Sequence, residues 1–262
     1  MNSMNWRIFD AKNITLGAKI KVGGVSYLNT KPLLYGIERS DLMNEIDLML
    51  DYPAKLAQSL KEGSIDVALL PVAAIPTISG ARIVSDYGIA ADGRVASVAL
   101  FSQVAVEEIK TVYLDYQSRT SVRLAQLLFE KHWQKEVEFK QAPENYIDYI
   151  NGVTAGVIIG DRALKQLNNF EYVYDLAESW KEYTGLPFVF AAWVASKELP
   201  ADFVRRFNEA NAEGFKHIDE IVAANPFPYY DLEKYYKRDV QYRIDDDKKK
   251  GLNRFLELIK TT

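Results

Sequence analysis

Hydrophobic positions in the first seventy residues switch between short apolar runs and helical spacing. Apolar runs at 20–25, 46–50 and 65–71 predict strands, and amphipathic spacing over 33–37 and 54–60 predicts the helices between them. The third run is apolar at nearly every position, as expected for a strand that is buried on both faces. The order strand–helix–strand–helix–strand predicts a parallel sheet covered by helices.

A second series of the same kind starts at residue 112. A short alternating strand over 112–114 is followed by a hydroxyl-rich turn at 117–121 and by a helix with its apolar face over 122–128. Residues 136–139 are a further strand candidate of this series, and the apolar run at 152–159 predicts another strand. The chain therefore carries two βα series.

Two extended segments, near 95–110 and 185–196, join these series, and the C-terminal part returns to helical spacing. A chain that crosses to a second lobe and comes back resembles the type II periplasmic binding proteins. We therefore expect an α/β fold of two lobes, each a mainly parallel sheet flanked by helices, with a ligand cleft between them at the carboxyl ends of strands. The expected division is a 1–18 extension, lobe 1 over 19–107 and 192–262, and lobe 2 over 108–191.

Composition excludes several classes of function. The chain has no cysteine and only two histidines, His132 and His217, which lie far apart, so we expect no disulfide and no metal site. A net charge of −4 gives no sign of nucleic-acid binding. The N-terminus lacks the pattern of a secretory signal, and no run is apolar enough to span a membrane. We therefore expect a cytoplasmic protein without membrane insertion; its oligomeric state is left open.

The turn 117–121 has the composition of an anion site. It contains Ser118, Arg119, Thr120 and Ser121 directly before a helix, whose first N–H groups lack intrahelical acceptors. The helix dipole favours negative charge at the same place. A carboxylate or phosphate is one interpretation; an ordinary capped helix with a solvated arginine is the other.

Two further turns carry polar groups at helix starts. Asn29 or Thr30 precedes a helix with Pro32 in its first turn, and Asp161 follows Gly160 after an apolar strand. Helix capping explains Asn29 and Asp161 equally well. Both turns would face the expected cleft.

Five motifs together resemble the chorismate dehydratases of the futalosine route to menaquinone. VSYLNTKPL at 25–33 is similar to the N-terminal signature of that family, and GRVASVALFS at 93–102 to its hinge strand. SRTSVRLAQLL at 118–128 resembles its anion turn. IGDRAL at 159–164 and WKEYTGLPFVFAAW at 180–193 complete the set, in the order of the family.

The resemblance implies a hydro-lyase that dehydrates chorismate, a small-molecule substrate, to 3-[(1-carboxyvinyl)oxy]benzoate without a cofactor. It implies Asn29 and Ser97 as active-site residues. We also expect a set of substrate-binding residues, either because the resemblance implies them or because they lie beside the turns. These are Tyr27, Ser118, Arg119, Thr120, Ser121, Gly160, Asp161, Thr184 and Phe188. Without the resemblance, Ser97 on a buried strand, Tyr27 and Phe188 are explained equally well by packing.

The motifs contain no histidine and no glutamate except Glu182. We therefore expect the enolpyruvyl carboxylate of the substrate to take the C3 proton, with Ser97 or Asn29 assisting departure of the C4 hydroxyl.

Three other functions are compatible with two lobes and an anion turn. A 1,4-dihydroxy-6-naphthoate synthase needs a histidine in the cleft, and neither His132 nor His217 is placed for it. A non-catalytic carboxylate-binding protein would carry a signal sequence, and a regulator would carry a DNA-binding segment before the lobes.

Overall fold

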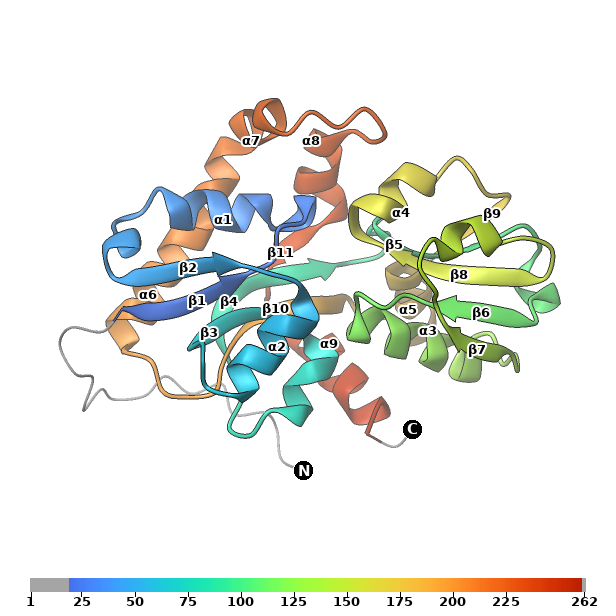
Figure 1. Cartoon of the computed structure of the whole chain (residues 1–262), viewed down its shortest axis with the longest axis horizontal. Helices are drawn as coiled ribbons and strands as arrows, with labels where there is room; N and C mark the ends of the chain where they lie inside the picture. The colour runs from blue at the N-terminus through green and yellow to red at the C-terminus, as the bar shows by residue number, and fades with distance from the viewer. Residues whose placement is uncertain (1–18, 261–262) are drawn as a thin grey trace.

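The structure, a computed structural model, describes residues 19–260 as two lobes, each built on one β-sheet (Figure 1). The extension expected over 1–18 lies outside the described residues. Across the sheet of the larger lobe the strands follow the order β11 (Gln241–Arg243), β4 (Arg82–Ala91), β10 (Phe188–Ala195), β3 (Val67–Pro71), β1 (Ile20–Gly24) and β2 (Ile46–Leu50). Across the sheet of the smaller lobe the order is β7 (Glu138–Gln141), β6 (Thr111–Leu114), β8 (Thr154–Ile159), β5 (Val98–Ser102) and β9 (Tyr172–Asp175).

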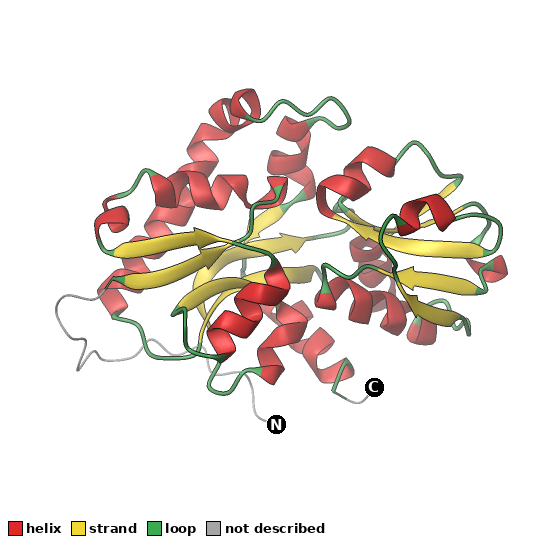
Figure 2. Ribbon diagram, viewed as in Figure 1, coloured by secondary structure: helices red, strands yellow, loops and turns green. Residues whose placement is uncertain are grey.

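Helices cover the faces of both sheets (Figure 2). The α-helices are α1 (Lys31–Glu38), α2 (Pro53–Lys61), α3 (Arg119–Lys131), α4 (Gly160–Gln166), α5 (Leu176–Thr184), α6 (Ala201–Glu213), α7 (Ile218–Ala224), α8 (Leu232–Lys234) and α9 (Asp246–Leu258). Short 3₁₀ segments are η1 (Leu28–Thr30), η2 (Asp41–Asn44), η3 (Val72–Thr77), η4 (Val106–Glu108), η5 (Tyr146–Tyr149) and η6 (Gly214–His217), and η7 (Tyr235–Asp239) is a π-helix.

Both sheets are mixed, so the prediction of mainly parallel sheets was wrong in this respect. Strand β1 runs parallel to β2 and β3, but β10 runs antiparallel to both β3 and β4. In the smaller sheet, β5 runs antiparallel to β8 and β9. Strands β5 and β10 follow the two crossings between the lobes. Each enters its sheet from the side at which the parallel strands end, and therefore runs against its neighbours.

Sheet membership also bears on the lobe boundaries. The chain leaves the larger sheet after β4 and joins the smaller one at β5, and it returns at β10. We therefore propose lobe boundaries within 92–97 and 185–187, instead of after 107 and 191. The first crossing segment contains Ser97, which lies just before β5 and not on a strand as expected from its alternation pattern.

The C-terminal part differs from its predicted helices. The helix predicted over 201–223 is divided into α6, η6 and α7, the one predicted over 231–237 ends as the π-helix η7, and the short strand β11 follows it. Close packing in this part depends on small residues. A Cβ added to Gly36 of α1 would lie 1.9 Å from the backbone oxygen of Ala210 on α6, so the two helices touch backbone to backbone there.

Buried hydrophobic side chains form one main cluster that extends through both lobes, and a second, smaller one lies within the smaller lobe. The lobes therefore share a core instead of being joined by linkers alone. Between 19 and 260, no helix has the length and apolarity needed to cross a membrane.

Candidate active site

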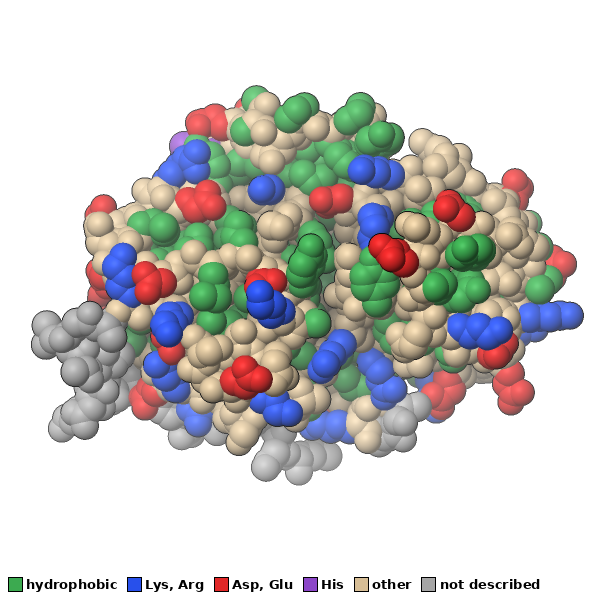
Figure 3. Space-filling view, in the orientation of Figure 1, with side chains coloured by type: hydrophobic (Ala, Val, Ile, Leu, Met, Phe, Trp, Pro, Cys, Tyr) green, Lys and Arg blue, Asp and Glu red, His purple; other side chains and the backbone are tan. Residues whose placement is uncertain are grey.

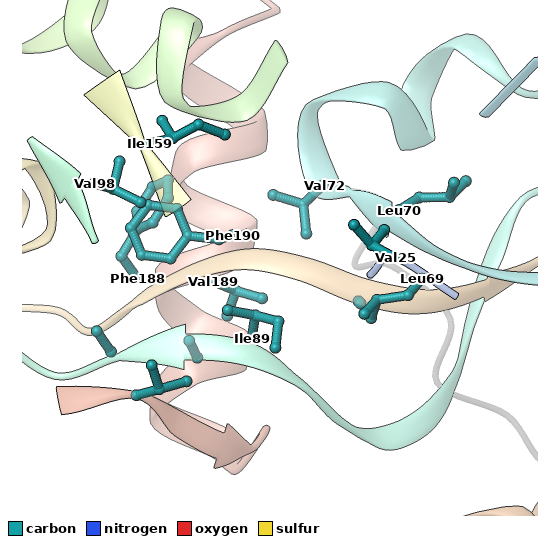
Figure 4. Packing of buried hydrophobic residues seen from close by; sticks show 14 of the residues in the cluster. Val25, Leu69, Leu70, Val72, Ile89, Val98, Ile159, Phe188, Val189 and Phe190 are labelled. Carbon is teal, nitrogen blue, oxygen red and sulfur yellow. The ribbon is translucent and has the colours of Figure 1, made fainter. Parts of the chain in front are cut away.

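A cleft of about 600 Å³, counting its open mouth, lies between the lobes where the parallel strands end. Its apolar walls include Val25, Leu69, Ile89, Val98, Ile159 and Phe190. Figure 4 shows Val98, Ile159 and Phe190 in one group and Val25 and Leu69 in another. Its polar lining consists of Tyr27, Asn29, Thr30, Ser97, Gln117, Ser118 and Ser121.

The N-terminus of α3 supplies two of these hydroxyls. Ser118 caps the helix, because its Oγ accepts a hydrogen bond from the Ser121 N–H at 3.1 Å. The two hydroxyls also contact each other at 2.9 Å. The remaining first-turn N–H groups have no intrahelical acceptor and lie at the positive end of the helix dipole. The predicted anion turn therefore opens into the cleft with hydroxyl and N–H donors.

The start of α1 is built differently. The Thr30 hydroxyl donates within its own turn, to the carbonyl oxygens of Val25 at 2.5 Å and Tyr27 at 2.7 Å. Asn29 lies in η1 and does not cap α1. Its side chain forms no hydrogen bond with any residue of the described part of the chain, although it lines the cleft. The capping explanation for Asn29 is therefore excluded, and its place in the cleft lining needs another explanation.

Ser97 reaches the cleft from the first crossing segment. The backbone N–H groups of Val95 and Ala96 donate to the buried carboxylate of Asp175, at 2.9 and 2.7 Å. The same carboxylate caps α5, and its burial raises its pKa to about 6 although backbone hydrogen bonds oppose the shift. Ala96 adopts φ 65°, an uncommon conformation for alanine that these bonds hold in place. The Ser97 carbonyl accepts from the Gly160 N–H at 2.7 Å, which fixes Ser97 against β8 and α4.

Two of the hydrogen bonds between the lobes involve the loop before α1. Tyr27 Oη donates to Gln117 Oε1 at 2.9 Å, and the Leu28 N–H donates to Asp161 Oδ1 at 3.2 Å. Burial and the neighbouring carboxylates raise the pKa of Tyr27 to about 12, so this phenol stays protonated at neutral pH. The two bonds close one side of the cleft.

A third bond between the lobes comes from η3. The Ala73 N–H donates to the Thr120 hydroxyl at 3.1 Å. The structure therefore has the lobes in contact around the cleft.

The cleft brings together six of the residues expected from the sequence, and leaves five outside its lining. Inside are Tyr27, Asn29, Ser97, Ser118, Ser121 and Gly160. Outside are Arg119, Thr120, Asp161, Thr184 and Phe188.

The five outside residues have other surroundings. Arg119 is exposed, and Thr120 and Asp161 join the lobes as described above. The Thr184 hydroxyl donates to the Trp180 carbonyl at the end of α5. Phe188 packs in the core against Trp180. Their expected contacts with substrate stay predictions.

Several lining residues were not among the expected site residues, and Gln117 and Phe190 are the two for which the sequence held a related observation. Gln117 stands next to the anion turn but was read only as part of it, and Phe190 was assigned to the core with Phe188. Alternation along β10 gave no usable signal, because the consecutive residues 190 and 191 both reach the lining, at an irregularity in the pairing of β10 with β4.

No Asp, Glu, His, Lys or Arg side chain lines the cleft within the described residues. On the face of the molecule shown in Figure 3, charged side chains of both signs are interspersed. His132 lies 3.4 Å from Glu182, and His217 contacts Glu213 and Glu220 on the surface of the larger lobe. Residues 19–260 contain no cluster of three potential metal ligands.

The comparison with protein families decides the assignment. The menaquinone biosynthesis family matches residues 20–261. The chain belongs to this family. Among curated relatives, the chorismate dehydratase of Campylobacter jejuni subsp. jejuni serotype O:23/36 (strain 81-176) is 30% identical over 262 residues, 91% of this chain and 96% of the relative. The chorismate dehydratase of Thermus thermophilus is 27% identical over 234 residues, 79% of this chain and 84% of the relative.

Solved structures are similar in fold at low sequence identity. The periplasmic aliphatic sulphonate binding protein SsuA of Escherichia coli superimposes with a TM-score of 0.60 at 12% identity, covering 94% of this chain and 92% of that one. This member of the menaquinone biosynthesis family therefore has the two-lobed periplasmic-binding-protein fold, as the sequence predicted.

Proposed function

We propose that this protein is a hydro-lyase that dehydrates chorismate to 3-[(1-carboxyvinyl)oxy]benzoate for menaquinone biosynthesis. Membership of the family and the two chorismate dehydratase relatives support this proposal. The observation that carries it is the pairing of an anion-binding helix terminus with a cleft whose lining contains no carboxylate or imidazole.

The reaction needs stabilisation of negative charge more than a strong acid. The C3–H bond of chorismate is vinylogous to the ring carboxylate, so its loss creates a carbanion that is delocalised as a dienolate. A carboxylate held by the hydroxyls of Ser118 and Ser121 and by the first-turn N–H groups of α3 gains stabilisation as this charge develops. Departure of the C4 hydroxyl then gives an aromatic ring, which supplies the driving force.

The base in this mechanism is the enolpyruvyl carboxylate of the substrate. Against Glu182 as the base, 62% of its side chain is exposed and it lies beside His132 outside the cleft lining. Asp161 is also outside the lining, and its carboxylate accepts the Leu28 N–H. Tyr27 is the one titratable side chain in the lining, and its raised pKa keeps it protonated. These observations support the substrate carboxylate as the base.

Asn29 and Ser97 act at the other side of the ring. The Asn29 amide and the Ser97 hydroxyl form no hydrogen bonds among the described residues, and both line the cleft. We assign them to holding the substrate and to donating to the C4 oxygen as it leaves.

The first experiment is incubation of the purified protein with chorismate in buffer without metal or added cofactor, followed by ultraviolet absorbance and mass spectrometry. We expect loss of one water and the spectrum of a substituted benzoate. Unchanged chorismate in folded protein would contradict the proposal. A thermal shift by chorismate without turnover would then favour a non-catalytic carboxylate-binding protein.

Two variants test the substrate as base. Glu182→Gln and Asp161→Asn each remove one neighbouring carboxylate without changing side-chain size. We expect both variants to turn over chorismate, with Asp161→Asn affected only as far as it weakens the bond to the Leu28 N–H. If either change abolished turnover while chorismate binding persisted, the base would belong to the protein.

A further inference from the structure

Asp175, the last residue of β9, accepts hydrogen bonds from four backbone N–H groups with one carboxylate that is 5% exposed. Its Oδ1 accepts from Ala177 and Glu178 at the start of α5, at 3.0 and 3.2 Å. Its Oδ2 accepts from Val95 and Ala96, at 2.9 and 2.7 Å. Helix capping accounts for the bonds to Oδ1. It does not account for the bonds to Oδ2, which hold the first crossing segment between the lobes.

The crossing segment makes a tight turn where Asp175 holds it. The Ser97 N–H donates to the Val95 carbonyl oxygen at 2.8 Å, which closes a three-residue turn around Ala96. Ala96 has φ 65°. A hydrogen bond from residue i+2 to residue i around a positive φ defines the rare, strained form of the γ-turn. Strained backbone persists only where its surroundings hold it. The N–H groups that Oδ2 accepts belong to the first two residues of this turn.

Ser97 is the third residue of the γ-turn, so the turn determines where its side chain lies. Its carbonyl oxygen accepts from the Gly160 N–H at 2.7 Å, which fixes the backbone on the other side. The side chain lines the cleft and is 1% exposed, and its hydroxyl has no hydrogen-bond partner among residues 19–260. Because none of these residues holds the hydroxyl directly, its position comes from the backbone that Asp175 holds.

We propose that Asp175 is a positioning residue for the dehydration: by holding the γ-turn at 95–97, its carboxylate places the Ser97 hydroxyl at the oxygen that leaves C4. This inference rests on the proposed function. Asp175 is outside the cleft lining and touches no reacting atom, so it acts through Ser97. Placement of this kind has a large effect on rate, because a displacement of about 1 Å can lower it about 100-fold.

The two oxygens of a carboxylate allow Asp175 to serve both pairs of N–H groups. Burial raises its pKa to about 6, so at neutral pH it is ionised and carries no proton that would oppose an N–H donor. Asparagine has one oxygen, and its NH₂ group would face N–H donors on the other side. Asparagine caps a helix about as well as aspartate, and release of the γ-turn relieves strain. We therefore expect Asp175→Asn to keep the cap of α5 and to release the turn.

The test is the steady-state kinetics of Asp175→Asn on chorismate. We expect kcat to fall about 30-fold, a smaller loss than in Ser97→Ala, with KM changed less than about twofold. Asp231→Asn is the matched control, because it makes the same substitution at the cap of α8, outside the cleft lining. We expect wild-type kcat for this control.

Two further measurements separate positioning of Ser97 from a general effect on the fold. In a Ser97→Ala background, Asp175→Asn should lower kcat less than about twofold further, because the hydroxyl that Asp175 positions is gone. Adding Ala96→Gly to Asp175→Asn should raise kcat about fivefold, because glycine adopts a positive φ without the strain that alanine has there.

A second variant, Asp175→Ser, keeps the inference testable if asparagine at this position unfolds the protein. Serine retains an oxygen that can cap α5, and it places no NH₂ group against the γ-turn. We expect this variant to fold, with a similar loss of kcat that again depends on the presence of Ser97.

Four results would overturn the inference. They are wild-type kcat in the folded variants of Asp175, equal losses of kcat with and without the Ser97 hydroxyl, no recovery of kcat by Ala96→Gly, and unfolding of both Asp175 variants, which would assign the carboxylate to stability. Each is read against a wild-type protein that turns over chorismate. Lack of turnover by the folded wild type would instead refute the proposed function, so the two failures are distinguishable.

Discussion

The starts of α1 and α3 follow the same sequence pattern and present different chemistry to the cleft. Both come after a strand and a polar turn, and both face the cleft from opposite lobes (Figure 1). At α3, Ser118 caps the helix and its hydroxyl meets that of Ser121 within the lining. At α1, the Thr30 hydroxyl is used by two carbonyl oxygens of its own turn.

The difference shows that the hydrogen-bond partner of each hydroxyl determines which donors a helix N-terminus has available for a ligand in the cleft. At α1, the 3₁₀ turn η1 precedes the helix and Pro32 has no N–H, so few backbone donors are left for an anion. At the N-terminus of α1, the polar group available in the cleft lining is the side-chain amide of Asn29. We infer that the N-terminus of α3 binds the carboxylate on which charge develops. Asn29 before α1 and Ser97 in the crossing segment then donate hydrogen bonds to the leaving hydroxyl.

The largest effect should come from the amide of the α1 start. Asn29→Ala removes a donor that acts only on the reacting part of the substrate, so we expect kcat to fall about 100-fold with a small change in KM. Steady-state kinetics on chorismate measures both constants. Asn225→Ala is the control, because it makes the same change at a helix end outside the cleft. A rise in KM alone would show that the two helix starts both serve binding.

The sequence predicted most of the fold because its signals are local. Strands β3 and β10 are apolar along their length since both faces are buried, and their predicted bounds differ little from those observed. The direction of β10 could not be predicted, because it depends on the lobe from which the chain arrives.

For the site, residues on a turn directly before a helix were predictable, and Ser118 and Ser121 are where the pattern placed them. Asp161 and Thr120 also stand at helix starts, but their side chains face the opposite lobe. That orientation depends on how the lobes dock.

Substitutions at the N-terminus of α3 should have an intermediate effect on KM, and they should separate helix capping from substrate binding. Ser118→Ala removes both a cap and a ligand donor, so we expect a loss of about 1 kcal/mol in the free energy of unfolding and a rise in KM of about tenfold. Ser121→Ala keeps its N–H and removes only a hydroxyl, so KM should rise with little loss of stability. Denaturant unfolding and steady-state kinetics measure the two quantities.

The control for this pair is Asp245→Ala, which removes the cap of α9 outside the lining. It should lower stability without changing KM. Equal KM values for wild type and Ser121→Ala would show that the hydroxyls at α3 only build the helix, and the contrast between the two helix starts would disappear.

The smallest effect should come from the bond that joins the two turns. Tyr27→Phe removes the hydrogen bond to Gln117, and we expect KM to rise about fivefold because closure of the cleft loses one contact. The folded-state pKa of Tyr27 is raised to about 12, so its protonated form stabilises the fold below pH 10, and this contribution is lost as the pH rises from 10 through 12. Denaturant unfolding between pH 8 and 11 should therefore show a shallower alkaline decline for Tyr27→Phe than for the wild type. Parallel declines would show that Tyr27 titrates freely, and the two turns would then act independently.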